Sequence, residues 1–185
     1  TAPYTYTWSN GAITASITGL SEGNYTVSVS DVNGCANSVS NSISEPDPLI
    51  MNLSVVSNVT CFGNANGVLD ANVSGGTTPY IYEWSNGVAA TASAENLSPG
   101  VYEVSVTDQN GCFVQDQRTI TEPPELIVDI EILNMIKCFG DETGQLKGSA
   151  SGGIQPYSYE WASNQTDVLI ENLPSDEYTL NVNDD

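Results

Sequence analysis

Polar and apolar residues alternate with a period of two along most of the chain. The clearest stretches are "YTVSVS" at 25–30, "YEVSVT" at 102–107 and "YTLNVN" at 178–183. Apolar residues also occupy every second position of 80–84, 69–73 and 126–132. Strict alternation is typical of half-buried β-strands, and no window has the 3.6-residue apolar spacing of an amphipathic helix. The pattern therefore predicts an all-β chain.

Turn signals separate these strands every 8–12 residues. They are "SGG" before Pro79, "SNG" after Trp84, "SPG" before Val101 and "QNG" after Asp108. We expect the Asn-Gly pair of "DQNGC" to form a type I′ hairpin turn, in which both central residues have positive φ. About seven short strands with turns between them favour a small antiparallel β-sandwich of immunoglobulin-like type.

The same phrases recur at nearly constant spacing. Trp8, Trp84 and Trp161 lie 76 and 77 residues apart, and "CFGNANG" at 61–67 returns as "CFGDETG" at 138–144. "ISEP" at 43–46 and "ITEP" at 120–123 close two of the units. We predict tandem repeats of about 77 residues: the C-terminal part of one at 1–46, a complete one at 47–123 and the N-terminal part of a third at 124–185. The chain is expected to be an internal fragment of a longer protein.

The most conspicuous repeated phrase is aromatic: "PYTYTWSNG" at 3–11, "PYIYEWSNG" at 79–87 and "PYSYEWASN" at 156–164. Tyr80, Tyr82 and Trp84 share one strand face, which suits a sugar-binding platform or the packing of a core. A unit this small needs large apolar side chains, so we predict packing. The predicted core aromatic residues are Trp8, Tyr25, Tyr80, Tyr82, Trp84, Tyr102, Trp161 and Tyr178. A Trp beside a Tyr that follows "SPG" also resembles the tyrosine corner of immunoglobulin-like sandwiches.

Charge excludes several classes of function. The chain has 23 acidic residues, 3 basic residues and no histidine, for a net charge of −20. Nucleic acids and anionic membranes require a basic surface, so neither is an expected partner. No stretch approaches the roughly 18 apolar residues of a membrane span, so no direct membrane insertion is expected. Without histidine, a phosphate-binding loop or a nucleophile elbow, we expect no enzyme activity.

The ordered motifs "CFGxxxG", "SGGxxPYxYxWSNG", "GxYxVxVxDxNGC" and "IxEP" resemble the SprB-type repeat of gliding-motility adhesins from the Bacteroidetes. The resemblance covers essentially the whole chain. It implies a very large, repetitive cell-surface protein that the type IX secretion system exports. It also implies that the gliding machinery carries the protein along the cell while the protein grips the substratum. The third unit departs from the pattern at "WASN" and "PSDEY", which does not threaten the predicted fold.

The four cysteines, Cys35, Cys61, Cys112 and Cys138, are expected to be structural, since disulfides are the default in secreted proteins. Cys61 and Cys112 should lie at opposite ends of one sandwich, too far apart for a bridge. End-to-end stacking would instead place Cys61 near a cysteine one repeat length after Cys112, beyond Asp185. Stapling of neighbouring repeats is therefore one prediction, and a bridge between Cys61 and Cys112 within one repeat is the alternative.

No cofactor is expected, and calcium is the one alternative that the residues suggest. Asp31, Asn33, Asp108 and Asn110 resemble the opening of a calcium loop, but no acidic residue stands at its twelfth position. The same residues are also typical of a hairpin turn, which is the interpretation that we favour. A second possibility is weak sites at repeat junctions, built from carboxylates that include Asp70, Asp141, Glu142 and Asp176.

These expectations converge on a structural and adhesive stalk, a filament of tandem sandwiches that is extracellular and attached to the cell surface. Short proline-rich linkers, "EPDP" at 45–48 and "EPP" at 122–124, restrict φ and should make the array stiff. The expected partners are neighbouring repeats, the substratum or a polysaccharide, and the gliding and secretion machinery. The alternatives are a repeat that itself binds polysaccharide or calcium, and an accessory module of a secreted hydrolase.

Overall fold

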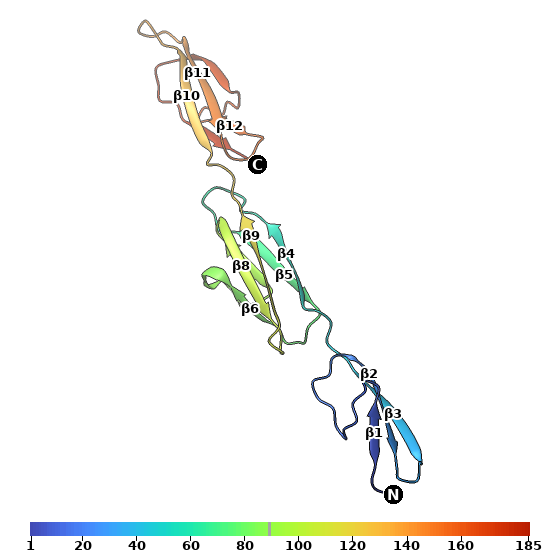
Figure 1. The fold of residues 1–185 in the computed structure, drawn as a ribbon. Helices are drawn as coiled ribbons and strands as arrows, with labels where there is room; N and C mark the ends of the chain where they lie inside the picture. Colours follow the sequence, from blue (N-terminus) through green and yellow to red (C-terminus); the bar gives the residue numbers. More distant parts are fainter. Residues whose placement is uncertain (89) are drawn as a thin grey trace.

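The computed structural model describes residues 1–88 and 90–185, and these residues form antiparallel β-sheets. Figure 1 shows three β bodies that follow one another along an elongated molecule. The first contains β1 (Thr5–Trp8), β2 (Gly23–Ser30) and β3 (Ala36–Ile43). The second contains β4 (Ile50–Ser57), β5 (Gly67–Ser74), β6 (Ile81–Trp84), β7 (Ser93–Leu97), β8 (Gly100–Thr107) and β9 (Phe113–Ile120). The third contains β10 (Ile127–Asn134), β11 (Gly144–Ser151), β12 (Ser158–Trp161), β13 (Leu169–Leu173) and β14 (Leu180–Asn183).

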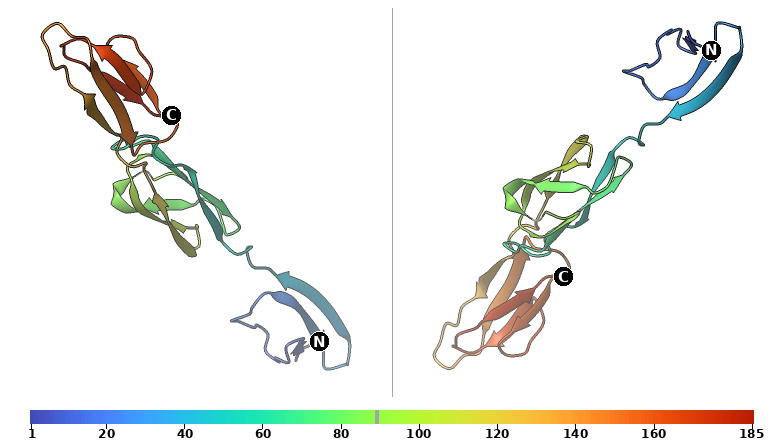
Figure 2. Two further views of the ribbon diagram at one scale, coloured as in Figure 1. Left: turned by 90° about the horizontal axis from the view of Figure 1, so that it is seen from above. Right: turned by 90° about the horizontal axis from the view of Figure 1, so that it is seen from below.

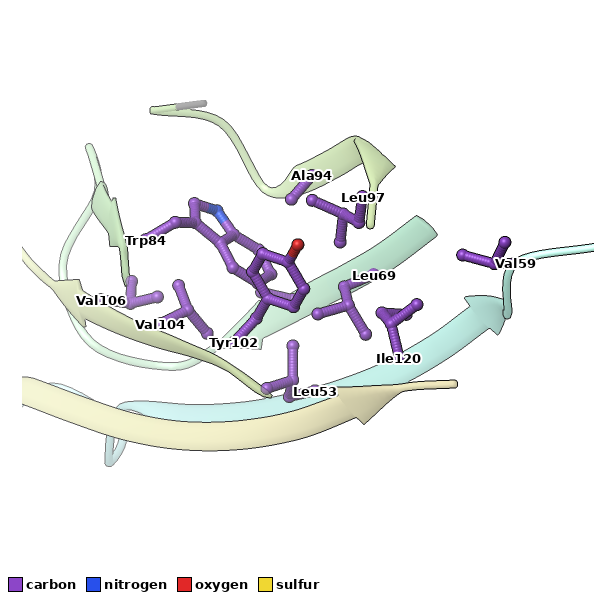
Figure 3. Close-up of a cluster of buried hydrophobic side chains, with 11 residues drawn as sticks. Leu53, Val59, Leu69, Trp84, Ala94, Leu97, Tyr102, Val104, Val106 and Ile120 are labelled. Atoms are coloured by element: carbon purple, nitrogen blue, oxygen red, sulfur yellow. The ribbon is translucent and has the colours of Figure 1, made fainter. Parts of the chain in front are cut away.

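The second body is a sandwich of two three-stranded sheets, in the orders β4-β5-β7 and β6-β8-β9. Its core lies between them, where Leu53 and Leu69 of one sheet meet Val104 and Val106 of the other (Figure 3). These side chains expose 1% of their surface or less, as alternation along the strands requires. The predicted all-β, immunoglobulin-like antiparallel fold is confirmed. The described residues of this body form six strands, where about seven were expected.

The other two bodies repeat parts of this arrangement. Sheet β1-β2-β3 corresponds to β6-β8-β9, because Trp8 faces Val27 in the same register that sets Trp84 opposite Val104. In the third body, β10-β11-β13 corresponds to β4-β5-β7, and the β12-β14 pair sets Trp161 opposite Leu180. The period-two pattern therefore produced the same pairing three times.

The "DxNG" turns differ from the expected type I′ geometry. Gly111 has φ of +85° and Gly34 of +82°, but neither Asn110 nor Asn33 has positive φ. The Gly111 N–H donates to the Asp108 carbonyl at 3.1 Å, which closes a four-residue turn before the left-handed glycine. This is the arrangement of a three-residue hairpin loop with a glycine bulge. Only the glycine needs the left-handed region, so the Asn-Gly pair alone did not fix the turn type.

The turn after each tryptophan is closed by a residue in the left-handed region. Gly11 and Gly87 take φ of +85° and +70°, and Asn164 takes +61° at the same place in the third body. Asparagine tolerates this conformation better than most residues. The change from "WSNG" to "WASN" therefore leaves the turn intact, with the Asn164 N–H donating to the Trp161 carbonyl at 2.8 Å.

Within the described part of the chain, the structure has no helix that is long and apolar enough to span a membrane. The only helical segment among these residues is the single 3-10 turn η1 (Ser85–Gly87).

Candidate functional site

The repeated aromatic residues lie in or against the cores rather than on an open platform. Trp84, Tyr102 and Trp161 are buried, and Tyr80 and Tyr82 pack against the core of the second body. Trp8 and Tyr25 are half-buried in the first body, and Tyr178 packs against Trp161 and its neighbours in the third. Burial also raises the pKa of Tyr82, and the nearby Tyr80 and Asp70 add to this effect.

The polar atoms of these aromatic side chains have backbone partners. The three indole N–H groups donate to the carbonyls of Thr14, Thr91 and Asp167 at 2.8–2.9 Å. The hydroxyl of Tyr102 donates to the Ser98 carbonyl at 3.0 Å, and the equivalent hydroxyls of Tyr25 and Tyr178 do the same four residues upstream. This is the tyrosine corner, and it leaves the aromatic side chains committed to structure.

Asp108, one of the calcium candidates, is almost fully buried and stabilises the turn in which it lies. Its carboxylate accepts hydrogen bonds at 2.9 Å from the backbone N–H groups of Thr77, Asn110 and Cys112. These bonds, that of Thr77 first, hold the pKa of Asp108 below its ordinary value. The Asn110 side chain donates to the Thr77 hydroxyl. Asp108 and Asn110 therefore hydrogen-bond the turn to Thr77, just before the aromatic phrase.

The same tie recurs in the other two bodies. Asp31 accepts at 2.9 Å from the N–H groups of Asn33 and Cys35, and at 2.8 Å from the backbone nitrogen of Thr1, which stands at the place of Thr77. The Asn33 side chain donates to the Thr1 hydroxyl. In the third body, Asp184 accepts from the Ile154 N–H at 2.7 Å. Among residues 1–88 and 90–185, no group of three or more Asp, Glu, Cys or His side chains could hold a metal ion.

All four cysteines are free and exposed. Cys112 directly precedes β9, while the loop of Cys61 meets the end of that strand, where the Val59 N–H donates to the Thr121 carbonyl. The two cysteines of the second body thus lie about one eight-residue strand apart, roughly 25 Å at ~3.3 Å per residue. A bridge between Cys61 and Cys112 is excluded by this geometry. Stapling to cysteines of further repeats stays a prediction.

The linker between the second and third bodies is hydrogen-bonded to both of them. Glu122 accepts a hydrogen bond from the Gly63 N–H at 2.8 Å, which ties the outgoing linker to the second body. Two residues later, the Pro124 carbonyl accepts from the Gly153 N–H at 2.9 Å, which ties the same linker to the third body. Only Pro123 stands between the two ties.

The "SGG" motif makes room for the linker. Gly75 and Gly152 have φ of +70° and +77°, and an added Cβ would lie 1.9 Å from the Pro48 carbonyl oxygen or 1.8 Å from that of Glu125. Both glycines are thus required by backbone conformation and by close approach. This role was not predicted from the sequence for "SGG" or for the glutamate of "ITEP", although both motifs recur, and "ITEP" overlaps the linker.

Two segments of the chain, residues 53–89 and 136–166, match the family model of the SprB repeat. This confirms the SprB resemblance that the motifs predicted. No curated protein matches the chain. Among solved structures, the chain is similar to the crystal structure of the C-terminal 282-residue fragment of intimin, in complex with the intimin-binding domain of the translocated intimin receptor. The TM-score is 0.41 at 14% identity, over 68% of this chain and 54% of that fragment, so the chain spans about half of the fragment's length.

Proposed function

From the SprB repeats that the chain carries, we propose that it is a non-enzymatic spacer segment of a large adhesin at the cell surface. In this role the repeats hold a distal binding region away from the cell. The full protein would be exported by the type IX secretion system and would serve attachment and gliding motility, as the SprB resemblance implies.

The observation that carries this proposal is the linker tied at both ends, by Glu122 on one side and Pro124 on the other. A linker with proline at two adjacent positions and hydrogen bonds to both neighbours has little conformational freedom left. Force applied along the chain would be transmitted from body to body through these bonds. The net charge of −20 supports the role, because self-repulsion keeps such an array soluble and extended.

A second candidate function is favoured by two exposed aromatic rings at equivalent tips. Phe62 and Phe139 follow the cysteines of the "CFG" loops and expose 52% and 109% of their surface. Exposed rings on successive repeats suit the faces of a polysaccharide. Calcium at the repeat junctions is the other ligand that we propose, with carboxylates such as Asp141, Glu142 and Asp176 as its ligands.

Binding of the intact chain to an array of polysaccharides separates these functions. The spacer role predicts no saturable binding, with or without millimolar calcium, and no change in melting temperature on adding calcium. Saturable binding to one glycan class that Phe139→Ala weakens at least tenfold would overturn it in favour of ligand binding. Tyr4→Phe, at an exposed ring in the first body, is the matched control and should leave any binding unchanged.

A further inference from the structure

The chain enters and leaves the second body at opposite ends, so tension along the chain acts on this body lengthwise. Figure 2 shows the second body between the other two, with one linker at each end. The chain enters through Asp47, shortly before β4, and leaves through Pro123, shortly after β9. Any tension on the array therefore reaches these two strands first.

β4 and β9 belong to different sheets, lie against each other and run in the same direction (Figure 3). Both begin at the end nearer the first body, because Gly76 is hydrogen-bonded to Asp47 before β4 and lies beside Asp108 before β9. Both end at the opposite end, where the Val59 N–H donates to the Thr121 carbonyl at 3.0 Å. Tension pulls β4 toward the first body and β9 toward the third, so it tends to slide the two strands past each other.

Three hydrogen bonds join the segment after β4 to the segment after β9, and we call them the exit clamp. Besides the bond from Val59, the Thr121 N–H donates to the Asn58 side-chain oxygen at 3.0 Å, so both backbone groups of Thr121 are bonded. One residue later, Glu122 accepts from the Gly63 N–H at 2.8 Å. Because these bonds connect two strands that run in the same direction, sliding loads them together rather than one after another.

Buried side chains beside the exit clamp oppose the same motion. Leu53 of β4, Val59 and Ile120 of β9 all belong to the core of the second body. An added Cβ on Gly67 would lie 2.7 Å from the Ile120 Cγ2 atom, so Ile120 is packed directly against β5. Sliding of β9 would draw Ile120 out of this position and leave a cavity, which costs free energy in addition to the broken hydrogen bonds.

We propose that the exit clamp bears mechanical load, carrying tension from β4 directly into the linker that leads to the third body. The hydrogen bonds join residues about 60 positions apart, so the intervening strands β5 to β8 carry little load until the clamp breaks. The use of this device at the cell surface rests on the proposed spacer role. Its resistance to tension depends only on contacts within the second body.

The test is to pull the intact chain by its two ends in a single-molecule force instrument. Unfolding of the second body is recognised as the longest length gain, about 200–250 Å for roughly 70 residues at ~3.6 Å each. Asn58→Ala combined with Glu122→Ala should lower the force of this event by at least half, because two of the three bonds lose their acceptors. Asn58→Asp keeps an acceptor for the Thr121 N–H and should unfold at the wild-type force.

Glu103→Ala removes an exposed carboxylate of β8 that lies outside the exit clamp, and it should leave the force unchanged. Forced unfolding is governed by the unfolding rate rather than by equilibrium stability. The melting temperature of each variant, followed through amide signals of β5, is therefore expected to change by only a small fraction.

Four results would overturn the proposal. They are an unchanged force in the double variant, an equal loss of force in Glu103→Ala, a loss of force in Asn58→Asp, and a double variant that loses its fold or melts at a temperature lowered in proportion to the force. The last result would make these side chains ordinary contributors to stability. No ligand takes part in the pulling experiment, so its failure leaves the spacer role to be decided by the polysaccharide array.

Discussion

At the scale of single residues, the aspartate of each "DxNG" turn connects the hairpin that contains it to the start of the aromatic phrase. Asp108 lies in the β8–β9 turn, yet it accepts from Thr77, which precedes β6 on the far side of β8. It therefore connects the two strands that flank β8 by a side-chain bond. Three N–H donors already stabilise the negative charge of this carboxylate, so its ionised form does not depend on a bound cation.

Replacing this aspartate should weaken the second body in a pH-dependent way. The folded pKa of Asp108 lies below its ordinary value of 3.8, so its contribution to stability is complete above pH 4 and is lost as the pH falls through the folded pKa. Asp108→Asn leaves the Thr77 N–H facing an amide nitrogen. We expect a lower melting temperature at pH 7 and a smaller further loss between pH 4 and pH 2 than the wild-type shows.

The measurement is thermal unfolding as a function of pH, followed through amide signals of β8. Glu103→Gln, which changes an exposed carboxyl of β8, is the control and should leave the profile unchanged. Identical pH profiles for Asp108→Asn and the wild-type would contradict the assigned role.

At the scale of elements, alternation predicted the strands well, because burial of one sheet face imposes a period of two. It could not give the turn geometry, since "DQNG" fits a type I′ turn, a bulged turn and the start of a calcium loop equally well. The bonds of Asp108 decide among these, and they join residues 31 positions apart. Nor could alternation show that Ile130 is exposed and Leu53 buried, since that depends on a neighbouring strand.

This difference in burial predicts unequal costs for equivalent substitutions. Leu53→Ala should lower the free energy of unfolding of the second body by about 2–5 kcal/mol, as is usual for a fully buried leucine. Ile130→Ala should cost the third body less than half as much, because its side chain is already partly hydrated. Urea unfolding followed separately through the amide signals of β5 and β11 measures both. Equal losses would mean that β10 is covered in solution.

At the scale of the whole molecule, the junctions determine what the array can do. The junction between the second and third bodies has a tie on each side of Pro123, through Glu122 and Pro124. The linker before the second body is hydrogen-bonded to that body, because the Gly76 N–H donates to the Asp47 carbonyl at 2.7 Å. Prolines alone predicted stiffness from the sequence, but the hydrogen bonds that complete the stiff junction come from loops about 60 and 30 residues away from the linker.

The central claim is that successive repeats form one stiff rod, and residual dipolar couplings of the intact, weakly aligned chain test it most directly. We predict that amide couplings from the second body and from the third body fit a single alignment tensor of one magnitude. A separate tensor of clearly smaller magnitude for β10–β14 would show independent motion about Pro123 and would contradict the account.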